Sequence, residues 1–84
     1  MTNDQIQNFL RPEYIGKSRI QISFRTRQSI AGIFIQSKDF AELKSKNLWR
    51  IVSETRIQEY AGSKNEDLAR IFNGTEITRL SLLS

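Results

Sequence analysis

Regular alternation of apolar and polar residues predicts the first β-strand of the chain. Its apolar members are Ile20, Ile22 and Phe24, and a period of two is typical of a strand with one buried and one solvated face. After a polar turn, a second apolar segment covers residues 30–35. Gly32 within this segment predicts a sharp bend or a bulge, which is common where a small barrel turns a corner.

A short helix over about residues 3–10 is predicted ahead of this strand. Thr2 or Asn3 can cap it. The apolar side chains at the i, i+3, i+4 spacing of one helix face are Ile6, Phe9 and Leu10. Pro12 ends the helix, because the residue before a proline avoids the α region. Since two helical turns are not stable alone, we expect the helix to pack on the strands.

The alternation is interrupted between residues 37 and 46. Asp39 can cap one helical turn in this interval. From Leu48 to Val52 an apolar run predicts a third strand, which can extend through residues 57–60.

Two short strands, residues 68–72 and 76–83, follow a polar loop at 62–67. Asn73 and Gly74 lie between them and predict a tight β-hairpin, because both residue types tolerate positive φ. One short helix followed by about five strands, all within residues 19–83, favours a mostly β fold with a small, strongly bent barrel over residues 1–84. The expected core consists of Ile20, Ile22, Phe24, Ile33, Ile35, Val52, Ile71 and Leu80.

Composition narrows how so short a chain can be stabilised. The 84 residues include no cysteine and no histidine, so we expect neither disulfides nor a metal site. A chain of this length buries only about 60–65% of its unfolded surface, which favours self-association. The absence of cysteine, of a signal-peptide pattern and of a long apolar run predicts a cytoplasmic protein without a membrane span.

An excess of basic residues raises the possibility of a nucleic-acid partner. The chain has 13 Lys and Arg against 9 Asp and Glu, a formal net charge of +4. Most cations precede residue 51, whereas the C-terminal third is nearly balanced. The carboxylates show neither metal-ligand spacing nor a paired base, and no glycine-rich phosphate loop is present. We therefore expect no enzymatic activity and no cofactor.

Two sequence motifs resemble those of the Sm-like family, which includes the LSm proteins and bacterial Hfq. In the first motif, Gly16 and Lys17 precede the first strand, and Gly32 follows Phe24 by eight residues. Asp39, Asn47, residues 48–52 and Glu54 then follow in the family's order. The second motif corresponds to Ile71, Phe72, Asn73, Gly74, Thr75, Glu76, Ile77 and Leu80.

The resemblance implies a short N-terminal helix and a five-stranded SH3-like barrel. It also implies a ring in which the last two strands of neighbouring subunits pair, and binding of single-stranded RNA. The family's base pocket is altered here: Ser45 occupies its stacking position, and Asn73 replaces its basic residue. The interval from Asp39 to Asn47 is about four residues longer than the corresponding interval of the family that the sequence resembles.

Loop cations and amides are the candidate nucleic-acid-binding residues. They are Lys17, Arg25, Arg27, Lys44, Lys46, Asn47, Arg50 and Asn73. Each has a second interpretation: Asn47 and Asn73 are common turn residues, and Arg25 and Arg27 can be solvated at a turn. Trp49 can belong to the core, to a subunit interface or to a base-stacking surface.

The sequence thus predicts an RNA-binding ring subunit that contacts phosphates more than bases. The alternative is a protein-interaction module on the same barrel, with the charge incidental.

Overall fold

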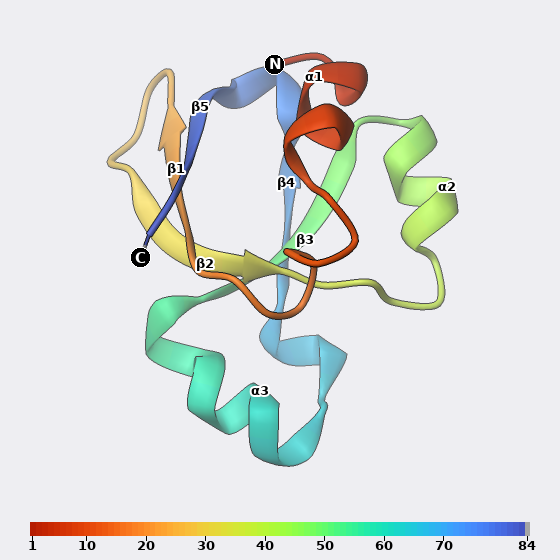
Figure 1. The fold of residues 1–84 in the computed structure, drawn as a ribbon, viewed down its shortest axis with the longest axis vertical. Helices are drawn as coiled ribbons and strands as arrows, with labels where there is room; N and C mark the ends of the chain where they lie inside the picture. The colour runs from red at the N-terminus through yellow and green to blue at the C-terminus, as the bar shows by residue number, and fades with distance from the viewer. Residues whose placement is uncertain (84) are drawn as a thin grey trace.

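The chain, described over residues 1–83 by a computed structural model, folds into a five-stranded antiparallel sheet with helices at both ends (Figure 1). The strands are β1 (Ile20–Phe24), β2 (Ile30–Phe34), β3 (Leu48–Ser53), β4 (Arg70–Asn73) and β5 (Ile77–Leu82). The α-helices are α1 (Asn3–Phe9), α2 (Phe40–Ser45) and α3 (Ile57–Ser63). Single 3₁₀ turns are η1 (Glu54–Arg56), η2 (Glu66–Leu68) and η3 (Gly74–Glu76). The prediction of an N-terminal helix and five strands is confirmed.

Helix α1 begins and ends where the sequence predicts. The Thr2 side chain accepts a hydrogen bond from the Gln5 backbone, and the Gln5 side chain accepts one from the Thr2 backbone, which forms a capping box. The helix ends at Phe9, with Leu10 as its C-cap, before Pro12. Ile6 and Leu10 are buried, so the helix is held by packing, as its short length requires.

The sheet curls, although its two edges do not pair. The strand order is β4-β3-β2-β1-β5, and within residues 1–83 no ladder joins β4 to β5. Strands β1 and β4 are separated in the sheet by β2 and β3. The curl nevertheless brings the ring centroids of Phe24 on β1 and Phe72 on β4 to within 5.4 Å of each other. Gly32 permits close approach of β2 to β3, because a Cβ there would lie 2.5 Å from the Val52 carbonyl oxygen.

The predicted hairpin at Asn73 and Gly74 is wrong. Strand β4 pairs with β3, and β5 pairs with β1, so the two segments flanking this dipeptide are not partners. Asn73 has a φ of −82° and is the N-cap of η3, which carries the chain from one sheet edge to the other. A tertiary requirement to reach β1 therefore overrides the local turn preference.

The structure also corrects the predictions for residues 57–67 and for the capping role of Asp39. Residues 57–60 belong to α3 and do not extend β3, and α3 runs on into the predicted loop at 62–67. Asp39 is the N-cap of α2 by position, but its side chain makes no capping hydrogen bond and binds Arg50 and Ser37 instead. Helix α2 occupies the interval between Asp39 and Asn47.

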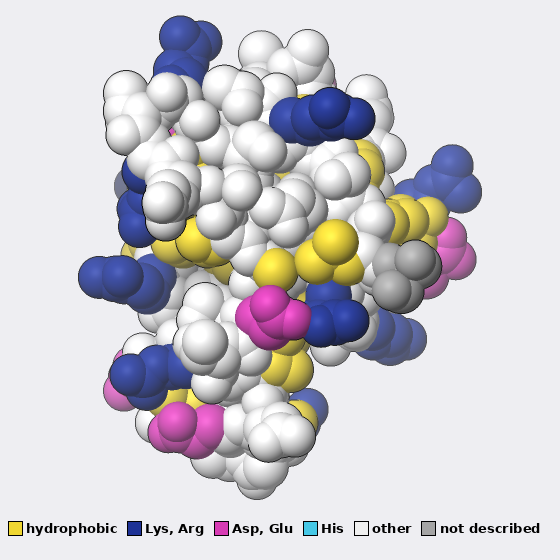
Figure 2. Space-filling model, turned by 90° about the vertical axis from the view of Figure 1, so that its left-hand side faces the viewer, with side chains coloured by type: hydrophobic (Ala, Val, Ile, Leu, Met, Phe, Trp, Pro, Cys, Tyr) yellow, Lys and Arg dark blue, Asp and Glu magenta, His cyan; other side chains and the backbone are white. Residues whose placement is uncertain are grey.

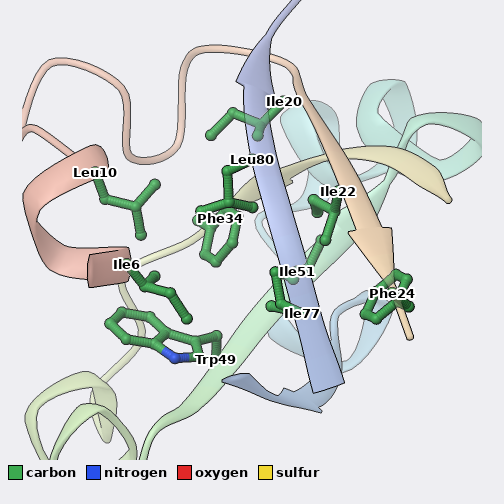
Figure 3. Packing of buried hydrophobic residues seen from close by; sticks show 10 residues of the cluster. All are labelled: Ile6, Leu10, Ile20, Ile22, Phe24, Phe34, Trp49, Ile51, Ile77 and Leu80. Atoms are coloured by element: carbon green, nitrogen blue, oxygen red, sulfur yellow. The ribbon is translucent and has the colours of Figure 1, made fainter. Parts of the chain in front are cut away.

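The larger hydrophobic cluster, here called the inner cluster, lies within the curve of the sheet (Figure 3). Its buried members are Ile6, Leu10, Ile20, Ile22, Phe24, Phe34, Trp49, Ile51, Ile77 and Leu80. In Figure 3, Ile6 of α1 and Leu10, its C-cap, cover one side of Phe34 and Trp49. Trp49 is 2% exposed, which identifies it as a core residue of the subunit.

A smaller cluster, here called the outer cluster, lies on the opposite side of the sheet. Its buried members are Ile33, Ile35, Val52 and Ala69, and Ile57 and Tyr60 of α3 pack against them. Seven of the eight predicted core residues belong to the two clusters. The eighth, Ile71, is 47% exposed on edge strand β4, so its assignment to the core is wrong. Within residues 1–83, no helix is long and apolar enough to cross a bilayer.

Candidate nucleic-acid interface

Asn47 connects three separate segments of the chain. Its backbone is left-handed, with a φ of 58°. Its Nδ2 donates to the Met1 carbonyl oxygen at 3.0 Å, and its Oδ1 accepts from Trp49 Nε1 at 2.8 Å. Its carbonyl oxygen accepts from the Gly74 amide at 2.8 Å. The amide side chain is thus engaged within the fold at both ends, and the structure places Asn47 as an anchor of the loops.

Around this anchor, α1, the β1–β2 turn, the end of α2 and η3 enclose a shallow depression of about 610 Å³, here called the loop hollow. Its lining residues are Met1, Thr2, Asn3, Gln5, Arg25, Ser45, Lys46, Asn47 and Thr75. Arg25 is held at its rim by two hydrogen bonds. Its Nε donates to the Thr75 carbonyl oxygen at 3.2 Å, and its backbone amide donates to the backbone carbonyl oxygen of Glu76. Three of the predicted residues, Arg25, Lys46 and Asn47, are brought together here.

The loop hollow combines positive charge with few free base-reading groups. No carboxylate is among the described residues that line it. The Lys46 ammonium lies 3.6 Å from the carboxylate of Glu42, which does not line the hollow. This ion pair is exposed, so it contributes little to stability and leaves the ammonium accessible. The Ser45 hydroxyl donates to the Glu42 carbonyl oxygen, and the Asn3 amide donates to that of Lys44. Arg25 and Lys46 can therefore contact phosphates, while most amides and hydroxyls are already engaged.

Arg27 lies in a second depression, of about 420 Å³, here called the corner hollow. Its lining residues are Phe24, Thr26, Arg27, Ile71, Phe72, Asn73 and Glu76. The Arg27 guanidinium carbon lies 5.3 Å from the centroid of the Phe24 ring and 5.4 Å from that of Phe72. Both distances are within cation–π range, so the two rings orient an otherwise exposed side chain.

Three other predicted residues lie apart or are engaged locally. The Asn73 Oδ1 accepts from the Thr75 amide and hydroxyl, at 3.0 and 2.9 Å, and so caps η3. The Lys44 ammonium lies 5.6 Å from the centroid of the Phe40 ring. Lys17 is exposed in the segment before β1, outside both hollows.

Arg50 is neutralised by a two-point ion pair. Its Nη2 and Nε donate to the two carboxylate oxygens of Asp39, at 2.8 and 3.1 Å. The hydrogen bonds from Arg50 and Ser37 lower the pKa of Asp39 well below its usual range, and Asp39 raises the pKa of Arg50. The pair joins the start of α2 to β3, so the structure assigns Arg50 a role in holding α2.

The contributions of α1 and η3 to these hollows were missed by the sequence analysis. Thr2, Asn3 and Gln5 line the loop hollow together with Thr75, and Glu76 lines the corner hollow. No local pattern marks them, because the N-terminal segment and η3 meet only in the folded protein. Figure 2 shows cations scattered over the face on the β1 side, some of them beside acidic side chains, with no continuous basic stripe.

Comparisons with known proteins add no relative. No protein-family model matches the chain, and neither curated proteins nor solved structures give a significant match.

Proposed function

We propose that the chain is a divergent Sm-like barrel that binds single-stranded RNA, mainly through its phosphates. The observation that carries the proposal is the loop hollow, where Arg25 and Lys46 flank a depression without a lining carboxylate. The N-terminal helix, the curled five-stranded sheet and the short η3 link from β4 to β5 support the Sm-like part of the proposal.

The engaged state of Asn47 supports contact with phosphates over contact with bases. An amide that already binds Met1 and Trp49 has limited capacity to hydrogen bond a base edge. Phosphate contacts carry no sequence information, so affinity should be similar for RNAs of different composition at this hollow. Counterion release then dominates binding, with a slope of about −0.7 in log K against log salt for each contacted phosphate.

Ring assembly through the two sheet edges is part of the same proposal. Strands β4 and β5 end the sheet, and each leaves a row of backbone groups open on one side. The two exposed large hydrophobic side chains of the described chain are Ile71 on β4 and Leu82 on β5, at 47% and 46% exposure. Pairing of β4 with β5 of the next subunit would bury both edges in a head-to-tail contact, which closes into a ring.

A salt titration of labelled U15, A15 and C15 RNA tests the RNA-binding proposal. We expect steep, linear salt dependence and similar affinity for the three sequences. Arg25→Glu and Lys46→Glu should each weaken binding of all three. Lys64→Glu is the matched control, because it makes the same charge change at the end of α3, outside both hollows. Multi-angle light scattering of the same samples measures the oligomeric state.

Several outcomes would contradict the proposal. No binding at low salt would exclude RNA as the partner. An equal loss of affinity in Lys64→Glu would show that net charge, and not the loop hollow, sets binding. A monomer mass at micromolar protein, with and without RNA, would exclude the ring.

One observation favours the alternative of a protein-interaction module. A depression of about 350 Å³, lined mainly by apolar side chains, lies between α1 and α2. It is lined by Gln7, Leu10, Pro12, Ile15, Gln36, Phe40, Lys44 and Trp49. Such a depression can receive an apolar side chain of a partner peptide. Absence of RNA binding in the salt titration would make this alternative the leading hypothesis.

A further inference from the structure

The corner hollow presents a planar cation held beside two aromatic rings. Arg27 is exposed, yet its guanidinium lies over both Phe24 and Phe72. These rings come from β1 and β4, whose approach depends on the curl of the sheet. Because the rings restrict the side chain before any ligand arrives, less conformational entropy is lost on binding. An accessible guanidinium held between aromatic rings can stack on a nucleobase.

A carboxylate lies in the same hollow. Glu76, the last residue of η3, lines it together with Arg27, and its side chain is exposed. No salt bridge joins Glu76 to a cation within residues 1–83. An ionised carboxylate only accepts hydrogen bonds, so it selects a ligand edge that carries donors. A phosphate, which also presents only acceptors, is disfavoured beside it.

Resting on the proposed RNA binding, we propose that the corner hollow binds a guanine base of the RNA, stacked on Arg27 and hydrogen-bonded to Glu76. Guanine presents two adjacent donors, N1–H and the N2 amino group, which match the two oxygens of a carboxylate. Uracil presents the single N3–H donor between two carbonyl acceptors, which the carboxylate repels. Cytosine and adenine offer an exocyclic amino group without the adjacent ring N–H, and therefore a weaker match.

The two hollows are adjacent through contacts between their turns. The Arg25 amide donates to the Glu76 carbonyl oxygen at 3.0 Å, and Arg25 Nε donates to Thr75. One RNA strand can therefore place a phosphate at Arg25 in the loop hollow and the base of a neighbouring nucleotide on Arg27. Arg27 and Glu76 come from turns beyond the strand ends, so neither belongs to the β4 edge that a ring would pair, although Ile71 of that edge also lines the hollow.

The test compares labelled U15 with an RNA of the same length whose central uridine is replaced by guanosine. We expect the wild-type protein to bind the guanosine-containing RNA about tenfold more tightly, as a good two-point base contact provides. Glu76→Gln should bring the ratio of the two affinities close to one while retaining binding of U15. Arg27→Lys, which keeps the charge and loses the planar group, should also reduce the ratio.

Glu59→Gln is the matched control, because it removes one carboxylate from α3, outside the corner hollow. It should leave the affinity ratio unchanged, and circular dichroism of each variant checks that the fold is intact. Equal affinities of wild-type protein for the two RNAs would overturn this inference alone. Failure of both RNAs to bind at low salt would overturn the proposed function together with it. A ratio unchanged in folded Glu76→Gln would exclude Glu76 as the reader of the base.

Discussion

The inner and outer clusters lie on opposite faces of one sheet and are built differently. The inner cluster has ten buried members, drawn from α1 and from four of the five strands. The outer cluster has four, and α3 covers it with the half-buried side chains Ile57 and Tyr60. The inner cluster is therefore a shared core, whereas the outer cluster depends on the single helix α3.

The difference predicts an uneven distribution of stability. Helix α3 has seven residues and is too short to persist without its contacts to the sheet. In Figure 1 it lies at the opposite end of the molecule from α1. We expect α3 to open locally at lower free energy than the strands around the inner cluster.

The largest expected effect comes from a charge in the inner cluster. Ile22 is fully buried on β1, between Ile30 and Leu80 on the neighbouring strands. Ile22→Asp would bury an unpaired carboxylate and should cost about 4 kcal/mol or more, which is comparable to the whole stability of a small domain. Circular dichroism should show an unfolded chain at 25 °C.

Gln21→Asp is the matched control for this variant. Its side chain alternates to the other face of β1 and is half-buried. It should remain folded, with only a modest fall in melting temperature. A folded Ile22→Asp protein would show that the inner cluster is not the main source of stability.

A pair of glycine substitutions gives the next largest contrast. A Cβ on Gly74 would lie 2.1 Å from Asn47 Oδ1, and Asn47 cannot move without breaking its bonds to Met1 and Trp49. Gly74→Ala should therefore destabilise by about 1–3 kcal/mol. Gly62→Ala meets nothing within 4 Å in α3 and should stabilise by about 0.5–1 kcal/mol. Urea denaturation of both variants measures the two changes in unfolding free energy. If both substitutions stabilised the protein, or both destabilised it, the contrast between the crowded Gly74 and the open Gly62 would be wrong.

Truncation of Tyr60 tests how far the outer cluster is separable. Tyr60→Ala should destabilise by about 1–2 kcal/mol and increase amide hydrogen exchange mainly in α3. Gln58→Ala, an exposed change on the same helix, should stay within about 0.5 kcal/mol of wild type. Equal acceleration of exchange in β1 and β5 would show that the clusters unfold as one unit.

The smallest expected effect is a pH dependence from Asp39, which joins α2 to β3. Its pKa is lowered in the folded protein by Arg50 and Ser37, whereas an unfolded aspartate titrates at about 3.9. The stabilisation is therefore present above about pH 4 and declines as the pH falls below that value. Asp39→Asn should melt below wild type at pH 7, and the difference should shrink at pH 3. Equal melting temperatures of wild type and Asp39→Asn at pH 7 would show that this ion pair does not stabilise the fold.

Periodicity and caps in the sequence determined the elements whose signals are local. The alternation through Ile20, Ile22 and Phe24 and the capping box at Thr2 predict β1 and α1 within a residue or two, because side-chain direction and end-capping depend on near neighbours. The cations at Arg25 and Arg27 were likewise identified from the turn in which they lie.

Only the tertiary structure decided which segments meet. Asn73 and Gly74 have the local chemistry of a hairpin, but the open edge of β1 recruits β5, so the chain crosses in a 3₁₀ turn. Ile71 has the alternation of a core strand but lies on an edge that no described element covers. Asn47, Met1 and Gly74 form one anchor although 73 residues separate its ends. Such contacts depend on the shape of the curled sheet, and near neighbours in the sequence carry no information about that shape.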